Sequence, residues 1–157
     1  MRVWRKVRES SDATLLTSIP GVGRYTALTV SAEIGDVSRF SDSHRLCAYA
    51  GIVPSVRNSA DVVHHGRITK IGSRMLRWIL AEAVHTHARY APDSDITAFY
   101  RRLSKRRGTA KATIAAASKM LRVIYWMLSE KREFVLHYSQ DHKRGVLCEG
   151  KPRNLTA

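Results

Sequence analysis

Apolar residues recur every three to four positions through most of the chain, the spacing of helices that bury one face. In the first third this spacing predicts three short helices. The first runs over 13–18, and the second carries Ala27 and Ile34 and stops at Gly35. The third spans 42–50, with Ser41 as its N-cap and Gly51 after its end.

The second half of the chain predicts longer helices. One begins near Gly72, ends before Pro92 and places one apolar face in the core, made of Ile71, Met75, Leu76, Ile79, Leu80, Ala83 and Val84. Another runs from about Ile96 to Gly108. The longest covers about 110–132, and its inward positions are Ile114, Ala117, Leu121, Ile124, Tyr125 and Leu128. We therefore expect an all-α helical bundle of five or six helices, with a helix-hairpin-helix near its start and one irregular basic loop that holds Ser59.

The first two helices are joined by Pro20-Gly21-Val22-Gly23, which predicts a helix-hairpin-helix. Glycine permits a tight turn and a close approach of the backbone to a ligand. The next helix presents free N–H groups and a positive dipole end, which bind phosphate without reading bases. We expect Gly21, Val22, Gly23 and Arg24 to grip a nucleic-acid backbone; the alternative is a plain helix–turn–helix corner.

Residues 55–69 show no helical periodicity. They form either an irregular basic loop or a small hairpin whose apolar part is Val62, Val63 and Ile68. Serines lie there among cations, and arginine matches two phosphate oxygens at once. The segment therefore either grips DNA passively or supplies an activated hydroxyl for attack on a phosphodiester. The cations in question are Arg57, Arg67, Lys70, Arg74 and Arg77.

The charge of the chain indicates a polyanionic partner. Lys and Arg number 27 and Asp and Glu 13, which gives 27 − 13 = +14 over 157 residues. These cations are spread along the chain, which favours a broad nucleic-acid surface over one basic helix on a membrane. With six or more phosphate contacts, affinity should fall about a thousandfold between about 50 and 200 mM salt. A second basic stripe comprises Arg101, Arg102, Lys105, Arg106, Arg107 and Lys111.

The sequence carries few signs of a metal site or a membrane anchor. Cys47 and Cys148 have no ligand partner at metal-binding spacing, and the acidic residues are scattered rather than paired for a two-metal site. No apolar run approaches the ~18 residues of a membrane span. We expect no membrane contact and no metal in this chain, and a cytoplasmic protein associated with the nucleoid.

A series of short motifs follows one another in fixed order along the chain. The motifs are Ile-Pro-Gly-Val-Gly (19–23), Ala-Glu-Ile-Gly-Asp (32–36), Arg-Phe (39–40), Leu-Cys-Ala-Tyr-Ala-Gly-Ile-Val-Pro (46–54), Ser59, Gly-Arg-Ile-Thr-Lys-Ile-Gly-Ser (66–73) and Met-Leu-Arg (75–77). With these motifs the chain resembles the C-terminal domain of the one-ten insertion-sequence transposases, which carry an N-terminal RuvC-like DEDD domain and are bridge-RNA-guided recombinases. The resemblance covers about 15–133.

The resemblance implies a DNA transposase or recombinase whose nucleophile is the serine of a Ser-Gly pair, which forms a covalent phosphoserine link to DNA. Ser59 holds the matching position, with Ser55 as the weaker alternative. Here the pair is Ser59-Ala60, and a turn that needs positive φ would strain Ala60.

The resemblance also sets expectations about organisation and partners. We expect the remnant of a connecting helix over 1–12, the transposase C-terminal domain over 13–135 and a polar tail over 136–157. The acidic Mg²⁺ site belongs to the RuvC-like DEDD domain, for which this chain has no room, so we expect a truncated reading frame or half of a split protein. Expected partners are DNA, a guide (bridge) RNA, the DEDD domain in cis or trans, and further copies in a homo-oligomer at full length. Two alternatives to catalysis stay open: a non-catalytic helix-hairpin-helix binding module, and a dimerisation module that uses the longest helix.

Overall fold

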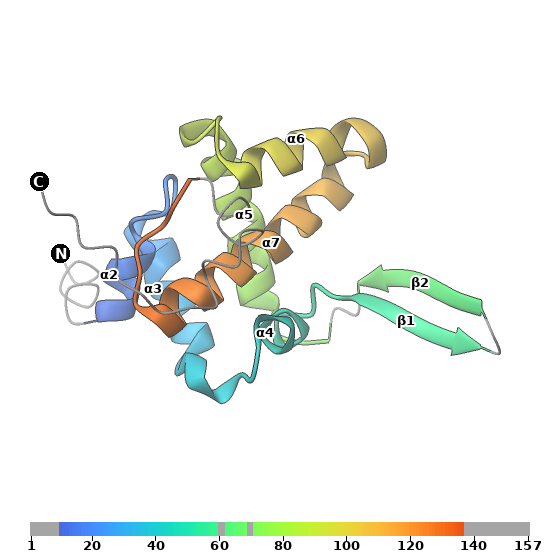
Figure 1. Ribbon diagram of the computed structural model, residues 1–157, viewed down its shortest axis with the longest axis horizontal. Coiled ribbons are helices and arrows are strands. Elements are labelled where there is room, and N and C mark those ends of the chain that lie inside the picture. The colour runs from blue at the N-terminus through green and yellow to red at the C-terminus, as the bar shows by residue number, and fades with distance from the viewer. Residues whose placement is uncertain (1–9, 60–61, 69–70, 137–157) are drawn as a thin grey trace, which may run out of the picture.

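The computed structural model describes residues 10–59, 62–68 and 71–136, which form six α-helices, one 3₁₀ turn and one β-hairpin (Figure 1). Residues 1–9, the dipeptides 60–61 and 69–70, and the tail 137–157 lie outside this description. The elements in chain order are α2 (Ser11–Leu16), α3 (Arg24–Ile34), η1 (Val37–Arg39), α4 (Ser43–Tyr49), β1 (Pro54–Ser59), β2 (Val62–Ile68), α5 (Arg74–Tyr90), α6 (Asp95–Arg107) and α7 (Thr109–Glu130).

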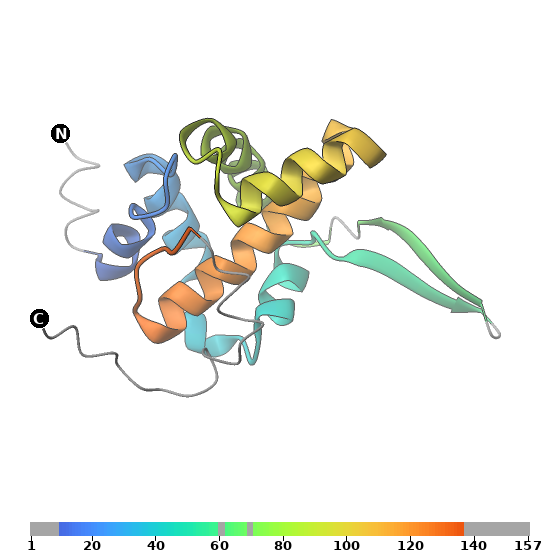
Figure 2. The same cartoon turned by 45° about the horizontal axis from the view of Figure 1, so that its top comes forward.

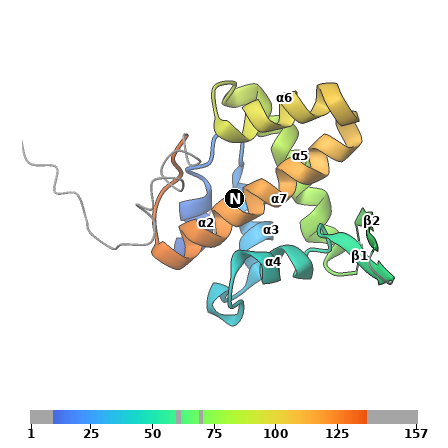
Figure 3. The same ribbon diagram turned by 45° about the vertical axis from the view of Figure 1, so that its right-hand side comes forward.

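Helix α7 forms the centre of the bundle. It packs against α2, α4, α5 and α6, and it crosses the molecule in all three overall views (Figures 1, 2 and 3). Its side chains at Ala117, Leu121, Ile124, Tyr125 and Leu128 are buried, as the periodicity predicts. Because α7 already buries most of its apolar surface within the chain, little of it is left for the dimerisation alternative.

The helical bundle confirms the predicted all-α fold class. The irregular basic loop that was expected to hold Ser59 was wrong: Pro54–Ser59 and Val62–Ile68 form a hairpin, the other structure that the sequence left open. β1 and β2 pair antiparallel, with Pro54 opposite Ile68 at one end and Ser59 opposite Val62 at the other. The register shifts between Pro54 and Val56. The hairpin extends away from the helices (Figures 1 and 2).

Two details of the helix predictions were wrong. The N-cap of α4 is Asp42, not Ser41: its Oδ1 accepts a hydrogen bond from the Arg45 amide at 2.8 Å. Ile71 and Met75 are 80% and 45% exposed instead of buried. Helix α5 begins only at Arg74, so Ile71 precedes it, and the inward face is centred one position after Met75.

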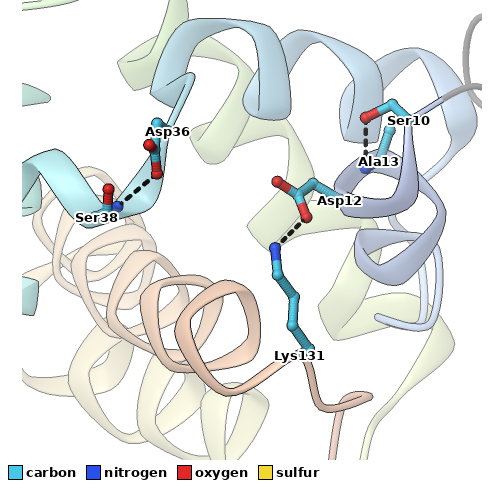
Figure 4. Close-up of polar contacts among 6 residues, drawn as sticks. All are labelled: Ser10, Asp12, Ala13, Asp36, Ser38 and Lys131. Carbon is cyan, nitrogen blue, oxygen red and sulfur yellow. Dashed lines mark hydrogen bonds and ion pairs between the residues drawn. The ribbon is translucent and has the colours of Figure 1, made fainter.

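Polar contacts fix the ends of several elements (Figure 4). Lys131, just past α7, forms an ion pair with Asp12 of α2 at 2.6 Å. Asp36 accepts a hydrogen bond from the Ser38 amide at 2.9 Å, and hydrogen bonds from Ser38 are the main reason why the pKa of the Asp36 carboxyl is lowered. The ion pair between Lys131 and Asp12 therefore ties the end of α7 to α2, the first helix of the bundle.

Candidate nucleic-acid interface

The turn between α2 and α3 divides the four predicted grip residues into an inner and an outer pair. Val22 is 8% exposed, and its amide donates to a carbonyl three residues earlier at 3.0 Å, so this N–H is already used. Gly21 has φ +83°, and a Cβ there would lie 2.8 Å from the backbone of α5. Gly23 and Arg24 are exposed. The turn therefore leaves Gly23 and Arg24 at the surface, held in place by Gly21 and Val22.

The N-terminus of α3 is suited to an anion. Its N-cap is Gly23, no side chain caps it, and its first turn contains no acidic residue. The N-terminus of α7 is likewise uncapped, whereas serine or aspartate side chains cap α2, α4, α5 and α6. The first-turn amides of a helix have no partner within the helix, and the helix dipole adds positive potential there. A phosphate is a ligand that such a helix end binds well.

His87 holds the same turn from the inside. It is fully buried, and its Nδ1–H donates to the Pro20 carbonyl at 2.8 Å, an oxygen that can only accept. The other ring nitrogen, Nε2, then accepts from the Ser94 hydroxyl at 2.6 Å. Burial lowers the pKa of His87, while the bond to Pro20 opposes this with a smaller effect. A neutral imidazole thus links the turn to the start of α6.

The root of the hairpin is fixed against α4 by close backbone contacts. Gly72 has φ +142°, and a Cβ there would lie 2.0 Å from the Tyr49 carbonyl oxygen. Next to it, Arg77 donates from Nη1 to the Ala50 carbonyl at 3.0 Å. Arg77 is one of the predicted phosphate clamps, and one of its N–H donors is therefore already used within the fold.

Ser73 joins the same root to α3. Its hydroxyl donates to Glu33 Oε2 at 2.5 Å and accepts from the Leu76 amide at 3.0 Å, which caps α5. The Ser73 hydroxyl therefore both donates and accepts a hydrogen bond within the protein. Glu33 is held beside the start of α5, where the dipole favours a negative charge.

Ser59 lies at the end of the hairpin farthest from the bundle. It is the last residue of β1 and pairs with Val62, and Arg57 pairs with His64 two positions nearer the root (Figure 2). Arg67 precedes Ile68, the β2 residue opposite Pro54 at the root. The predicted site residues Lys70 and Ala60 lie outside the described residues.

The hairpin separates Ser59 from the arginines of α5. Five residue steps from Pro54 to Ser59 at ~3.3 Å each give about 16 Å. An arginine side chain cannot bridge that length. Of the predicted clamps, Arg57 lies in the outer part of the hairpin with Ser59, whereas Arg67, Arg74 and Arg77 lie at its root. Within one chain, a phosphate at Ser59 is therefore out of reach of Arg74 and Arg77.

The second basic stripe covers the last turns of α6 and the start of α7. All of its six side chains are exposed, and Lys105, Arg106 and Arg107 occupy the last turn of α6, where the helix dipole favours cations. The two ion pairs found among the described residues, Lys131–Asp12 and Arg132–Glu130, do not involve the stripe. The α6–α7 junction and the hairpin leave the bundle on the same side (Figures 1 and 3).

Trp78 is a surface residue that the periodicity analysis did not single out. It is 51% exposed on α5, near the root of the hairpin. The sequence does contain a signal for it: the inward register runs through Leu76, Ile79, Leu80 and Ala83, and a tryptophan at position 78 falls outside that register.

Neither a metal cluster nor a membrane-spanning helix occurs within the described ranges. No three His, Cys, Asp or Glu residues there lie close enough together to hold a metal ion. None of the helices there has the length and apolar character needed to cross a membrane.

Comparison with known proteins identifies relatives of this chain. Residues 13–101 match the family model described as Transposase IS116/IS110/IS902 family. The chain is similar to the transposase for insertion sequence element IS1111A of Coxiella burnetii, with 33% identity over 130 residues, or 81% of this chain and 35% of that protein. It is 30% identical over 141 residues to the pilin gene-inverting protein of Moraxella bovis, or 85% of this chain and 43% of that one. An uncharacterized 43.6 kDa protein of insertion element IS110 from Streptomyces coelicolor is 27% identical over 116 residues, or 74% of this chain and 28% of that one.

These alignments also fix the relative lengths. The chain spans about a third of the length of the first curated relatives that it matches. The matched family region begins within α2, includes α3 to α5 and the hairpin, and reaches into α6.

Proposed function

Because the chain belongs to the IS116/IS110/IS902 transposase family, we propose that it supplies the serine nucleophile, Ser59, for DNA strand cleavage and exchange. One observation carries this proposal: Ser59 ends a β-strand that extends away from the helical bundle. A residue at that position can be brought to a phosphodiester without moving the core. The names of two relatives, a transposase and a gene-inverting protein, fit a reaction that cuts and rejoins DNA.

The proposed chemistry is a transesterification. The Ser59 oxygen attacks the phosphorus, forms a new O–P bond and loses its proton to solvent, while one bridging P–O bond to a deoxyribose breaks and that oxygen takes a proton from solvent and leaves as a hydroxyl. The phosphodiester is conserved as a protein–DNA ester. Attack by another DNA hydroxyl then reverses the step and returns the proton to Ser59. Cationic donors stabilise the charge that builds on the phosphoryl oxygens.

The cations divide this work by position. We assign Arg57 to the phosphate at Ser59, because both lie in the outer half of β1. Arg67, Arg74 and Arg77 hold the DNA backbone nearer the root, and we assign Lys70 to the same DNA backbone from the sequence alone. Gly23 and Arg24 bind a further phosphate at the N-terminus of α3, with Gly21 and Val22 setting the turn.

The complete reaction requires more than this chain. The proposal includes a RuvC-like DEDD domain in cis or trans with its Mg²⁺, a guide (bridge) RNA, and assembly of several copies. No cluster of three or more metal-ligating side chains occurs among the described residues. We therefore assign the ion to the DEDD domain. The aligned region is about a third of each relative, which leaves the rest of its length for such a domain.

The test compares two serines of the same strand. In an assembly of this chain with the acidic domain of a full-length relative, Ser59→Ala should lower cleavage of a DNA that carries the element's ends by at least about a thousandfold, because the nucleophile is gone. Ser55→Ala is the matched control and should cleave like the parent. Loss of cleavage in Ser55→Ala alone would move the nucleophile to Ser55.

A non-catalytic helix-hairpin-helix binding module is the second candidate, and the uncapped N-terminus of α3 favours it. This alternative expects full DNA affinity and no covalent adduct in the parent. It also expects strand exchange by the assembly to survive Ser59→Ala. An adduct that Ser59→Ala abolishes without loss of DNA affinity would exclude it.

A further inference from the structure

Three apolar side chains are exposed together at the root of the hairpin. Ile71 is 80% exposed, Met75 45% and Trp78 51%. Met75 and Trp78 lie three positions apart on α5 and therefore share one face of the helix. Ile71 lies just before that helix begins. We call these three residues the exposed stripe.

Most other rings of the described chain have an aromatic neighbour. Phe40 packs on Tyr49, His85 on Tyr100, His87 on Phe134 and Tyr125 on Trp126. Within the described ranges, no ring or cation is recorded against Trp78. A half-exposed indole without a ring neighbour has a face to offer to a ligand.

The cation of Arg74 lies one helical turn away from this indole. Arg74 is one helical turn before Trp78, so their side chains are neighbours on the surface of α5. Arg74 is exposed, and its side chain forms no ion pair or hydrogen bond with another residue in the described part of the chain. A guanidinium next to a free aromatic face matches the phosphate and the base of a single nucleotide.

The size of the stripe argues against a protein partner. A stable protein interface buries about 800 Å² on each side, far more than three partly exposed side chains provide. One or two unpaired bases, in contrast, need little more than an aromatic face and flanking cations. The +14 charge of the chain favours the same partner.

We propose that the exposed stripe binds one or two unpaired nucleotides, with a base stacked on Trp78 and Arg74 on the adjoining phosphate. The inference rests on the proposed function, because it states that the DNA strand bound beside the Ser59 hairpin is locally unpaired. Met75 and Ile71 flank the base with apolar surface. The hairpin then holds the strand where it leaves the duplex.

The experiment measures affinities of the full chain for a single-stranded DNA of about 20 nucleotides and for the duplex of the same sequence, at one salt concentration. Trp78→Ala should lower single-strand affinity about tenfold through loss of stacking and leave duplex affinity within about twofold. Trp78→Phe keeps a ring and should restore most of the loss. Tyr90→Ala is the matched control, since Tyr90 is a 70% exposed aromatic at the far end of the same helix and should have no effect.

Each remaining outcome counts against one proposal in particular. Equal losses for single strand and duplex, or equal losses in Trp78→Ala and Tyr90→Ala, would overturn the stacking role. A change of oligomeric state in Trp78→Ala with single-strand affinity intact would make the stripe a protein interface. Failure of the parent to bind either DNA would instead count against the proposed function. Unchanged unfolding midpoints in urea confirm that the variants fold.

Discussion

His87 shows how one side chain can join three parts of the fold. Its ring is fully buried between the Pro20 turn and Ser94, and both ring nitrogens are used. Ser94 also accepts from the Thr97 amide at 3.3 Å, so the same hydroxyl caps α6. A second proton on the ring would leave the Ser94 hydroxyl without its acceptor.

This arrangement predicts acid sensitivity. Burial keeps the pKa of His87 below its ordinary 6.5 in the folded chain, so below about pH 6.5 the unfolded chain binds a proton that the folded chain does not. The free energy of unfolding should therefore fall as the pH decreases through 6.5, by up to about 1.4 kcal/mol per pH unit. Urea unfolding at several pH values between about 5.5 and 7.5 measures this slope.

His87→Gln is the control for this prediction. Glutamine can donate to Pro20 and accept from Ser94 but does not titrate, so its stability should vary less with pH over the same range. An unchanged slope in this variant would assign the acid sensitivity to other groups.

At the scale of elements, the stop signals were the most predictable part. Gly35 and Gly108 follow the ends of α3 and α6 as expected. The error at Met75 arose because a methionine beside Leu76 fits a helical apolar pattern whichever of the two faces inward. Only the packing of α5 against α7 decides which face is buried.

The hairpin could not be chosen from the sequence. Val62 and Val63 are adjacent, so β2 lacks a clean alternation, and the dipeptide between the strands lacks the Asn-Gly or Asp-Gly signal of a tight hairpin. The same ambiguity limits what the sequence predicts about the geometry of the site. The residue types of the site were readable from the family resemblance, but the separation of Ser59 from Arg74 follows only from an extended strand.

The helix-hairpin-helix turn gives a prediction on paired glycines. Gly21→Ala should lower the free energy of unfolding by about 2 kcal/mol, because φ is +83° and the new Cβ would meet the backbone of α5. Gly23→Ala is the matched control. Its φ is −75°, no atom lies within 4 Å of the new Cβ, and its stability should stay within about 0.5 kcal/mol of the parent. Equal stabilities in urea would show that the turn does not pack on α5 as described.

At the scale of the whole molecule, two basic elements lie on one side of the bundle. The hairpin and the basic stripe of α6 and α7 lie on the same side of the bundle, and the exposed stripe lies at the root of that hairpin (Figure 3). Lys119, by contrast, is partly buried, with its Nζ 3.3 Å from the Asp95 carbonyl, and burial lowers its pKa. It belongs to the packing between α6 and α7 rather than to a DNA surface.

The charge distribution predicts a steep salt dependence. DNA affinity of the full chain should fall about a thousandfold between about 50 and 200 mM salt if six or more phosphates are contacted. Fluorescence anisotropy with a labelled duplex, repeated across that range, measures the slope. A nearly flat dependence would indicate that the cations of the chain do not contact the DNA backbone.

The most direct test is the site of covalent attachment. Trypsin cleaves after Arg57 and Arg67, and the peptide between them, residues 58–67, contains Ser59 as its one hydroxyl side chain, whereas Ser55 falls in the preceding peptide. The assembly with the acidic domain is incubated with DNA and digested with nuclease and trypsin, and the peptides are then analysed by mass spectrometry. We predict a nucleotide mass on peptide 58–67. Its absence there, or its presence only on the peptide that contains Ser55, would contradict the assignment of Ser59 as the nucleophile.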